Sequence, residues 1–236
     1  MSRYVIEFAK QGYIKYISHL DMQRLFKRAF KRAGIPIEYS QGYNPHPKIG
    51  FAQPLALGYT ACQEYLEFNT TESIELTRVI SELREAMPQG VDIININELD
   101  IPQKSLASAI ISAVYEVKLP ITYKLRHKEL ESYLEGYLNQ EEIIAQKREK
   151  KTKKLVDKDI KSQIRSIIVT ERGDGYSALE MELDTGSSSN LSPEQVINSF
   201  AKYSSLYLPR EEIEVERKYL IFDSCIPQTA GLHLSK

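Results

Sequence analysis

The chain has 236 residues, enough for one large domain or two small ones. Its 31 Lys and Arg against 32 Asp and Glu exclude a uniformly basic nucleic-acid binder, so any affinity for anions must come from local clustering. Cys62 and Cys225 are far apart, which argues against a disulfide framework or a Cys-rich zinc site. We see neither a signal peptide nor an apolar run of roughly 20 residues, so we expect a cytoplasmic protein without a membrane span.

The first part of the chain alternates between strand and helix patterns. Alternating apolar residues predict strands, and apolar residues three or four apart predict helices. The predicted elements are a strand at 3–9, a helix at 19–33, a strand at 48–57, a strand at 62–70, a helix at 74–87 and a strand at 91–99. This β-α-β-β-α-β order is that of a ferredoxin-like α+β domain.

The same order returns after residue 112. The predicted elements are a strand at 113–121, a helix at 126–139, a basic strand or hairpin arm at 143–154, a strand at 176–183, a helix from Ser192 to about 203 and a strand at 213–222. Residues 161–170 belong either to the basic ribbon or to a separate strand. The element order therefore predicts two tandem ferredoxin-like domains, 1–102 and 113–223, with a linker at 103–112 and a tail at 224–236.

The helix predicted at 19–33 has two different sides. Ser18 is a suitable N-cap, and Gly34 followed by Ile35-Pro36 is a stop signal. An apolar side faces the core, and the opposite side carries a row of cations: Arg24, Lys27, Arg28 and Lys31, with Arg32 beside them. Such a row matches the phosphates of a nucleic-acid strand, whereas a solvated face usually mixes charges of both signs. The simpler alternative is a solvated face that binds nothing.

A polar and aromatic loop follows this helix. Tyr39, Tyr43 and His46 are flat groups beside cations, as base stacking on single-stranded RNA requires, and Asn44 could read a base edge. Lys48 ends the loop and adds a further cation. The alternative is a well-packed loop in which the tyrosines cover the end of the sheet. We expect the cationic side of the helix and this loop to form one surface.

The histidines also raise the possibility of catalysis. A metal-independent ribonuclease could use His46 or His19 with Lys48 in acid–base chemistry, although histidines more often stack or form hydrogen bonds. The spacing of His19, Asp21, His46 and Cys62 matches no metal motif, so we predict no metal site. A Gly-rich phosphate loop and a cysteine triplet for an iron–sulfur cluster are also missing from the sequence, so we predict no cofactor.

A second basic run lies in the later part of the chain. Its densest part is Lys150, Lys151, Lys153 and Lys154. On a two-stranded ribbon these cations would form a positive arm able to lie along a nucleic acid. The alternative is a solvated hairpin, and Asp157 and Asp159 weaken the local field.

Three segments resemble a known family: YISHLD, RAGIPIEYSQGYNPHPKI and FAQPLALG, all between residues 12 and 59. They are similar to the radical-SAM-associated family of unknown function, and the resemblance continues more weakly through EYLEF and KKTKKLVDKDIKSQI. It implies a bacterial cytosolic protein whose partner is a separately encoded radical-SAM enzyme, because this chain lacks the radical-SAM half. Relatives often occur beside a ribonuclease of the RNase E/G type, which points to RNA metabolism.

Three hypotheses follow from the sequence. The preferred one is an RNA-binding module that presents tRNA or rRNA to a radical-SAM enzyme. The second is a metal-independent ribonuclease or RNA-modifying enzyme centred on His46. The third is an adaptor that binds only protein, with its basic side on an acidic partner. The sequence does not define the oligomeric state.

Overall fold

The computed structural model describes residues 2–99, 104–120, 127–149, 154–173, 175–223 and 232–234. The chain divides into two compact units, the first made of Met1–Ile111 and Arg217–Lys236 and the second of Ser112–Glu216. Both units combine helices with mostly antiparallel strands, which confirms the α+β class. No helix in the described ranges has the length and apolar character needed to cross a membrane.

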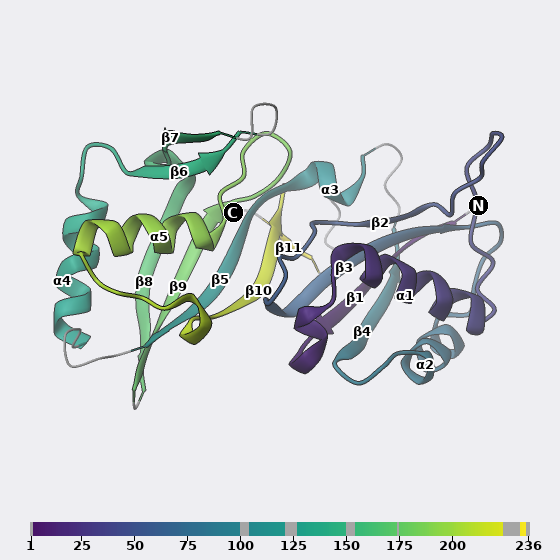
Figure 1. Cartoon of the computed structure of the whole chain (residues 1–236). Coiled ribbons are helices and arrows are strands. Elements are labelled where there is room, and N and C mark those ends of the chain that lie inside the picture. Colours follow the sequence, from purple (N-terminus) through teal and green to yellow (C-terminus); the bar gives the residue numbers. More distant parts are fainter. Residues whose placement is uncertain are drawn as a thin grey trace. The chain divides into compact units, whose positions relative to one another are not determined.

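The first unit begins with a β-α-β-β-α-β order. Its elements are β1 (Ser2–Lys10), α1 (His19–Arg32), β2 (Ile49–Phe51), β3 (Thr60–Thr70), α2 (Leu76–Ala86), β4 (Val91–Glu98), the short helix α3 (Leu106–Ala109), most of β10 (Glu214–Phe222) and β11 (His233–Leu234). A 3₁₀ helix at Gly12–Tyr16 joins β1 to α1. Strand β1 lies between β4 and β3, and β2 pairs with β3. Helices α1 and α2 lie together on one side of this sheet (Figure 1).

Helix α1 begins and ends where its sequence signals predict. The Ser18 hydroxyl accepts a hydrogen bond from the backbone N–H of Asp21, which caps the first turn. At the other end Gly34 has a φ of +61°, and the Ile35 N–H donates to the Phe30 carbonyl at 3.0 Å. This is the Schellman arrangement that favours glycine. The predicted start at residue 19 is therefore confirmed, and the helix ends at Arg32, one residue before the predicted end.

The core of the first unit lies between the sheet and α1. Met22, Phe26, Ala29 and Phe30 are buried along one side of α1. The ring of Phe26 meets that of Phe8 on β1 edge to face, with centroids 4.9 Å apart. Burial of one such aromatic side chain stabilises the fold by about 1.5–3 kcal/mol, so this apolar side fixes α1 on the sheet.

One predicted strand is shorter than expected. Residues 48–57 were assigned to a single strand, but β2 covers only Ile49–Phe51. Pro54 has no N–H to donate to a ladder, and the segment after it turns at Gly58, whose N–H donates to the Lys15 carbonyl. Residues 52–58 consequently form a loop beside the 3₁₀ helix.

The second unit contains a sheet, two helices and a hairpin. Its elements are β5 (Ile110–Pro120, which starts in the first unit), α4 (His127–Leu138), β6 (Ile144–Arg148), β7 (Leu155–Asp159), a 3₁₀ turn at Lys161–Gln163, β8 (Ile164–Arg172), β9 (Tyr176–Asp184), α5 (Pro193–Ser204), a 3₁₀ turn at Arg210–Glu212 and the start of β10. Strand β9 lies between β5 and β8 with antiparallel pairing on both sides. Most of 161–170 therefore belongs to a separate strand, one of the two alternatives left open.

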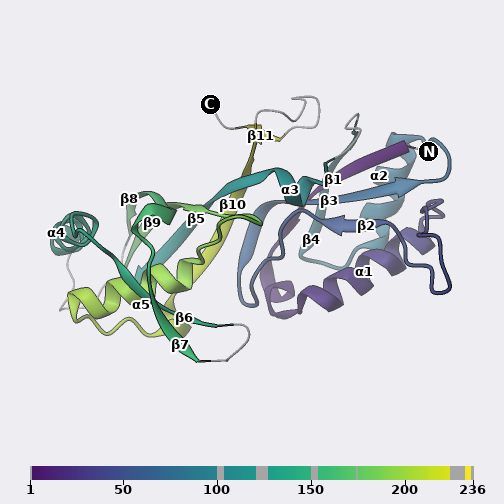
Figure 2. The same ribbon diagram turned by 90° about the horizontal axis from the view of Figure 1, so that it is seen from above.

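Helix α5 shows how well local signals position an element. Ser192 and Gln195 form a reciprocal capping box, and Pro193 occupies the first turn. The hairpin β6–β7 runs beside this helix (Figure 2). The Ser199 hydroxyl of α5 donates to the Ile144 carbonyl of β6 at 2.8 Å, which anchors the hairpin.

Some predictions fall on residues outside the described ranges. They include Lys150, Lys151 and Lys153 of the basic run, Cys225, and most of the predicted tail. Within that tail, His233 and Leu234 form β11, which pairs in parallel with β10. Within the predicted linker, residues 106–109 form α3, and β5 begins at Ile110.

Candidate functional site

The cationic side of α1 is exposed along its whole length. Arg24, Lys27, Arg28, Lys31 and Arg32 all project from the helix into solvent. Two of them have partners on the protein: Arg24 pairs with Asp21 at 2.9 Å, and Arg32 donates to the Ala86 carbonyl of α2. An exposed pair of this kind contributes little to stability, so Arg24 can exchange Asp21 for another anion at small cost.

A groove runs between α1 and the end of α2. It has a volume of about 560 Å³. Arg24, Arg28 and Arg32, spaced four residues apart, line one wall, together with Asp21. The opposite wall includes Glu85 and Met87. Three guanidinium groups on one wall give the groove a positive side that suits a row of phosphates.

The loop after α1 is held at its base by an ion pair. Lys48 Nζ lies 2.5 Å from the nearly buried Glu38 carboxylate, and Asn69 Nδ2 of β3 donates to the same carboxylate at 3.1 Å. These hydrogen bonds hold the pKa of Glu38 below its ordinary value, and the one from Lys48 has the larger effect. Lys48 therefore holds the base of the loop, and its contact with a nucleic acid stays a prediction.

The tip of the loop is exposed. An isolated bridge joins Tyr39 to Pro47, and the backbone N–H of His46 donates to the Ser40 hydroxyl at 2.9 Å. Tyr43 and Asn44 project into solvent, as does His46. The loop is anchored on β3 and on itself, and its aromatic groups remain accessible for stacking.

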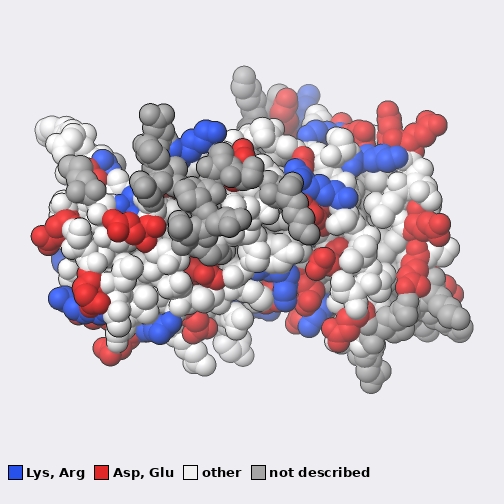
Figure 3. Space-filling model, turned by 180° about the vertical axis from the view of Figure 1, so that it is seen from behind, with Lys and Arg blue, Asp and Glu red and all other residues white. Residues whose placement is uncertain are grey.

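Charges on another face of the molecule are mixed. In the second unit Lys154 is exposed, and its backbone carbonyl accepts a hydrogen bond from the Glu149 N–H. Figure 3 shows one face of the molecule, where Lys and Arg side chains are interspersed with Asp and Glu. The side of α1 described above thus differs from this face in carrying five cations and one acid.

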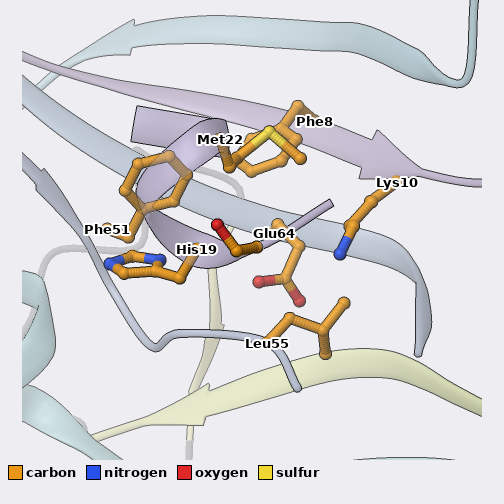
Figure 4. Close-up of a pocket in the computed structure, with 8 residues that line it drawn as sticks. Phe8, Lys10, His19, Met22, Phe51, Leu55 and Glu64 are labelled. Atoms are coloured by element: carbon orange, nitrogen blue, oxygen red, sulfur yellow. The ribbon is translucent and has the colours of Figure 1, made fainter. Parts of the chain in front are cut away.

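A second candidate site is a small cavity inside the first unit. Its volume is about 20 Å³, and its apolar walls come from Phe8, Met22, Phe51 and Leu55. The side chains of Lys10, His19 and Glu64 also line it (Figure 4). Lys10 and Glu64 are only 4% and 3% exposed. Charged side chains are rarely buried to this extent unless they are paired or functional.

Glu64 is paired with an arginine from the end of the chain. Arg217 Nε donates to one carboxylate oxygen at 2.6 Å, and Arg217 Nη2 donates to the other. The same nitrogen donates to the Gln53 carbonyl at 2.8 Å, and Arg217 is 1% exposed. This two-point geometry is the strongest form of an Arg–carboxylate pair.

The cavity lowers the affinity of its bases for protons. Burial lowers the pKa of Lys10, with Arg217 acting in the same direction and Glu64 opposing it. Burial also lowers the pKa of His19, and the nearby Lys10 charge adds to the effect. His19 Nε2 lies 3.0 Å from Gln23 Nε2. Burial and the Lys10 charge therefore favour the uncharged form of the imidazole.

Sequence reasoning missed Lys10, Glu64 and Arg217. A signal was available for Lys10 and Glu64 but not for Arg217: Lys10 shares strand parity with the core residues Tyr4, Ile6 and Phe8. Glu64 likewise shares parity with Leu66 and Phe68. Charged residues at core positions of two neighbouring strands indicate a buried polar cluster.

The described part of the chain contains no group of three or more His, Cys, Asp or Glu side chains arranged to hold a metal ion. His19 and His46 lie on separate elements, His19 in the first turn of α1 and His46 in the loop after it. Cys62 on β3 is a thiol rather than part of a disulfide. His19, His46 and Cys62 thus lie on three different elements, α1, the loop after it and β3.

The first unit thus presents a basic groove, an exposed aromatic loop and a small cavity lined by buried charged side chains. Residues 3–193 match DUF2344, described as an uncharacterized protein conserved in bacteria, and the chain belongs to this family. The expected membership of a bacterial family of unknown function is confirmed. No curated protein matches the chain.

Solved structures of similar fold are found. A chain in the crystal structure of a Cbf5-Nop10-Gar1 complex superposes with a TM-score of 0.53 at 10% sequence identity. The match covers 92% of this chain and 48% of the other, so this chain spans about half the length of its structural neighbour. At this identity the similarity concerns the fold alone.

Proposed function

We propose that this protein is an RNA-binding module whose primary contact is the cationic side of α1. The observation that carries the proposal is the row of Arg24, Arg28 and Arg32 along one wall of the open groove between α1 and α2. Arginines spaced by one helical turn can each contact a successive phosphate of a strand. Counterions released from those phosphates would supply most of the binding free energy.

The exposed loop would add contacts to the bases. Tyr39, Tyr43 and His46 are exposed and would stack on bases, and the exposed Asn44 would read a base edge. Lys48 would contribute electrostatically while it holds Glu38. We further propose that Lys154 and its neighbours Lys150, Lys151 and Lys153 bind RNA through the second unit.

We also propose that each unit is a ferredoxin-like domain. In the first unit the neighbour order β4-β1-β3-β2, with α1 and α2 on one side, supports this assignment. In the second unit β5, β9 and β8 follow the same neighbour pattern, and the hairpin β6–β7 is inserted between α4 and β8. The domain limits proposed from the sequence are 1–102 and 113–223, and they differ from the compact units at 217–223, which belong to the first unit.

The partner enzyme is part of the proposal. The resemblance of segments within residues 12–59 to the radical-SAM-associated family supports a role in which this chain presents tRNA or rRNA to a separately encoded radical-SAM enzyme in the cytoplasm. Co-purification of such an enzyme with the tagged chain, in a complex that requires RNA, is the expected result. A complex that survives nuclease treatment, without RNA affinity, would favour the protein-only adaptor.

The direct test uses two matched double variants. Arg24→Gln with Arg28→Gln removes two cations from the groove, and Arg78→Gln with Lys202→Gln removes two exposed cations from α2 and α5. RNA affinity is measured at several salt concentrations with bulk tRNA and rRNA fragments. The groove variant should weaken binding and reduce the slope of log K against log salt by about two, and the control should leave both unchanged.

The same RNA samples separate binding from catalysis. Intact RNA after incubation supports the presenting module. New fragments that disappear in a His46→Ala variant with unchanged affinity would support the ribonuclease instead. Equal losses in the groove variant and its control would overturn the assignment of the interface to α1.

A further inference from the structure

Lys10 is a buried amine with few partners. Its side chain reaches the cavity beside Glu64 (Figure 4), and the residue is 4% exposed. An ammonium group has three N–H donors, but within the described residues the hydrogen bond found for Lys10 Nζ is a long one of 3.4 Å to the Lys15 carbonyl. A buried ammonium with so few hydrogen bonds is costly, which favours the neutral amine or a bound group.

The size of the cavity limits what can reach Lys10. A volume of about 20 Å³ has room for one water-sized group. A whole nucleotide is therefore excluded, whereas a single functional group can enter. The apolar walls of Phe8, Phe51 and Leu55 favour an uncharged group over an ion.

The charges around the cavity act on the same amine. Glu64 faces Lys10, but both of its carboxylate oxygens accept hydrogen bonds from Arg217. The negative charge of Glu64 is therefore shared between Arg217 and Lys10. Burial lowers the pKa of His19, which favours the uncharged imidazole beside the amine. The lowered pKa of Lys10 gives the amine a larger neutral fraction than an exposed lysine has, and the neutral amine is the nucleophilic form.

We propose that Lys10 is a nucleophilic amine that forms an imine with a small, uncharged carbonyl compound entering this cavity. Nothing in this proposal depends on RNA binding by α1. The ligand class is a very small aliphatic aldehyde, because the cavity has room for one water-sized group.

The chemistry is a condensation without oxidation or reduction. The Lys10 nitrogen pair forms a C–N bond while the C=O π pair moves onto oxygen, and a proton passes from nitrogen to that oxygen to give a carbinolamine. Protonation of the hydroxyl lets it leave as water while nitrogen forms the C=N bond, and loss of the last N–H proton gives the imine. His19, which lines the same cavity, can accept and return these protons.

The test traps the imine in the native protein. Formaldehyde is used as the smallest carbonyl probe with cyanoborohydride as the reductant, and methylation is measured at each lysine by peptide mass spectrometry. At pH 7 Lys10 should be methylated several-fold faster than the exposed Lys27 and Lys31 of α1. The ratio should fall as the pH approaches 10.5, because the exposed amines then become neutral too.

Size selection provides the matched control. Benzaldehyde is too large for the cavity, so it should label Lys27 and Lys31 but not Lys10. A Leu55→Phe variant, which fills the cavity from its loop side, should slow formaldehyde labelling of Lys10 and leave that of Lys27 unchanged.

The outcomes are distinct from those of the RNA experiments. Methylation of Lys10 no faster than that of Lys27 at pH 7 would overturn the proposal and assign the buried amine a purely structural role, with a water molecule in the cavity. The wild-type comparison needs no variant, so the result does not depend on the folding of a mutant. Loss of RNA affinity in the α1 variant would leave Lys10 labelling unchanged.

Discussion

The first unit handles charge in two opposite ways. On α1 five cations project into solvent, where water and salt screen them and their pairs are weak. In the interior of the same unit, Lys10, Glu64 and Arg217 are each at most 4% exposed, and apolar side chains surround the cavity beside Lys10 and Glu64. The exposed charges are thus available for a ligand at little cost to the fold, and the buried ones are part of the fold itself.

This difference separates function from stability. Replacing an exposed cation should change binding and leave folding intact, whereas replacing one member of the buried cluster leaves its partner as an uncompensated charge. The same chemical change, one positive charge lost, therefore has very different consequences in the two places.

The largest effect is expected at the buried pair. Arg217→Met should lower the free energy of unfolding by about 3–5 kcal/mol, because Glu64 then stays buried without its two hydrogen bonds. Urea unfolding followed by circular dichroism measures this loss. The double variant Arg217→Met with Glu64→Leu should regain most of it, and a single-variant loss below about 1 kcal/mol would contradict the assigned role.

The next effect is a pH dependence of stability that arises at Lys10. Because burial lowers its pKa below 10.5 in the folded protein, the unfolded chain binds more protons between the two pKa values. The free energy of unfolding contributed by this group should therefore rise with pH through that window. In Lys10→Met this rise should be absent, so the stability of the wild type relative to the variant should increase between pH 7 and pH 10.

A difference between wild type and variant is needed here because tyrosines titrate in the same range. Burial raises the pKa of Tyr65 and Tyr137, which lowers stability as the pH passes 10 in both proteins. A constant difference between the two proteins across the window would contradict the prediction.

An intermediate effect on stability is expected at the start of α1, the helix that carries the exposed cations. Ser18→Ala removes the N-cap of α1 and should lower the free energy of unfolding by about 1 kcal/mol. Ser18→Thr keeps the hydroxyl and should retain most of the stability. Thermal or urea unfolding of the two variants compares them directly, and equal losses would show that the hydroxyl does not cap the helix.

The smallest effect on stability is expected at the exposed cations. Lys27→Gln with Lys31→Gln should change the free energy of unfolding by no more than about 0.5 kcal/mol, because both side chains are exposed. The same variant should weaken RNA binding. A large loss of stability would show that these cations stabilise the folded protein. The difference between exposed and buried cations described above would then not hold.

Capping and stop signals in the sequence predicted the helix ends, which depend on residues close in the chain. Ser18 and Gly34 gave the ends of α1, and Ser192 with Pro193 gave the start of α5, because caps act within one helical turn. The exposed cations of α1 were predictable for the same reason, since helical spacing alone places them on one side.

The buried cluster could not be predicted in the same way. Arg217 and Glu64 are separated by 153 positions, and no local pattern relates them. The length of β2 also depends on its pairing with β3 and on the loop after Phe51 rather than on its own composition. Long-range pairing thus determined the features that the sequence did not reveal.

The late position of Arg217 has a consequence for synthesis. The first unit needs residues from Arg217 onward, so it cannot complete its interior when its own first 111 residues have left the ribosome. At about 5–20 residues per second, the wait between Glu64 and Arg217 is roughly 8–30 s. During that time Glu64 cannot form its ion pair with Arg217, because Arg217 has not been synthesised. The second unit, Ser112–Glu216, is synthesised before Arg217. The order of synthesis therefore allows the second unit to fold before the first unit is complete.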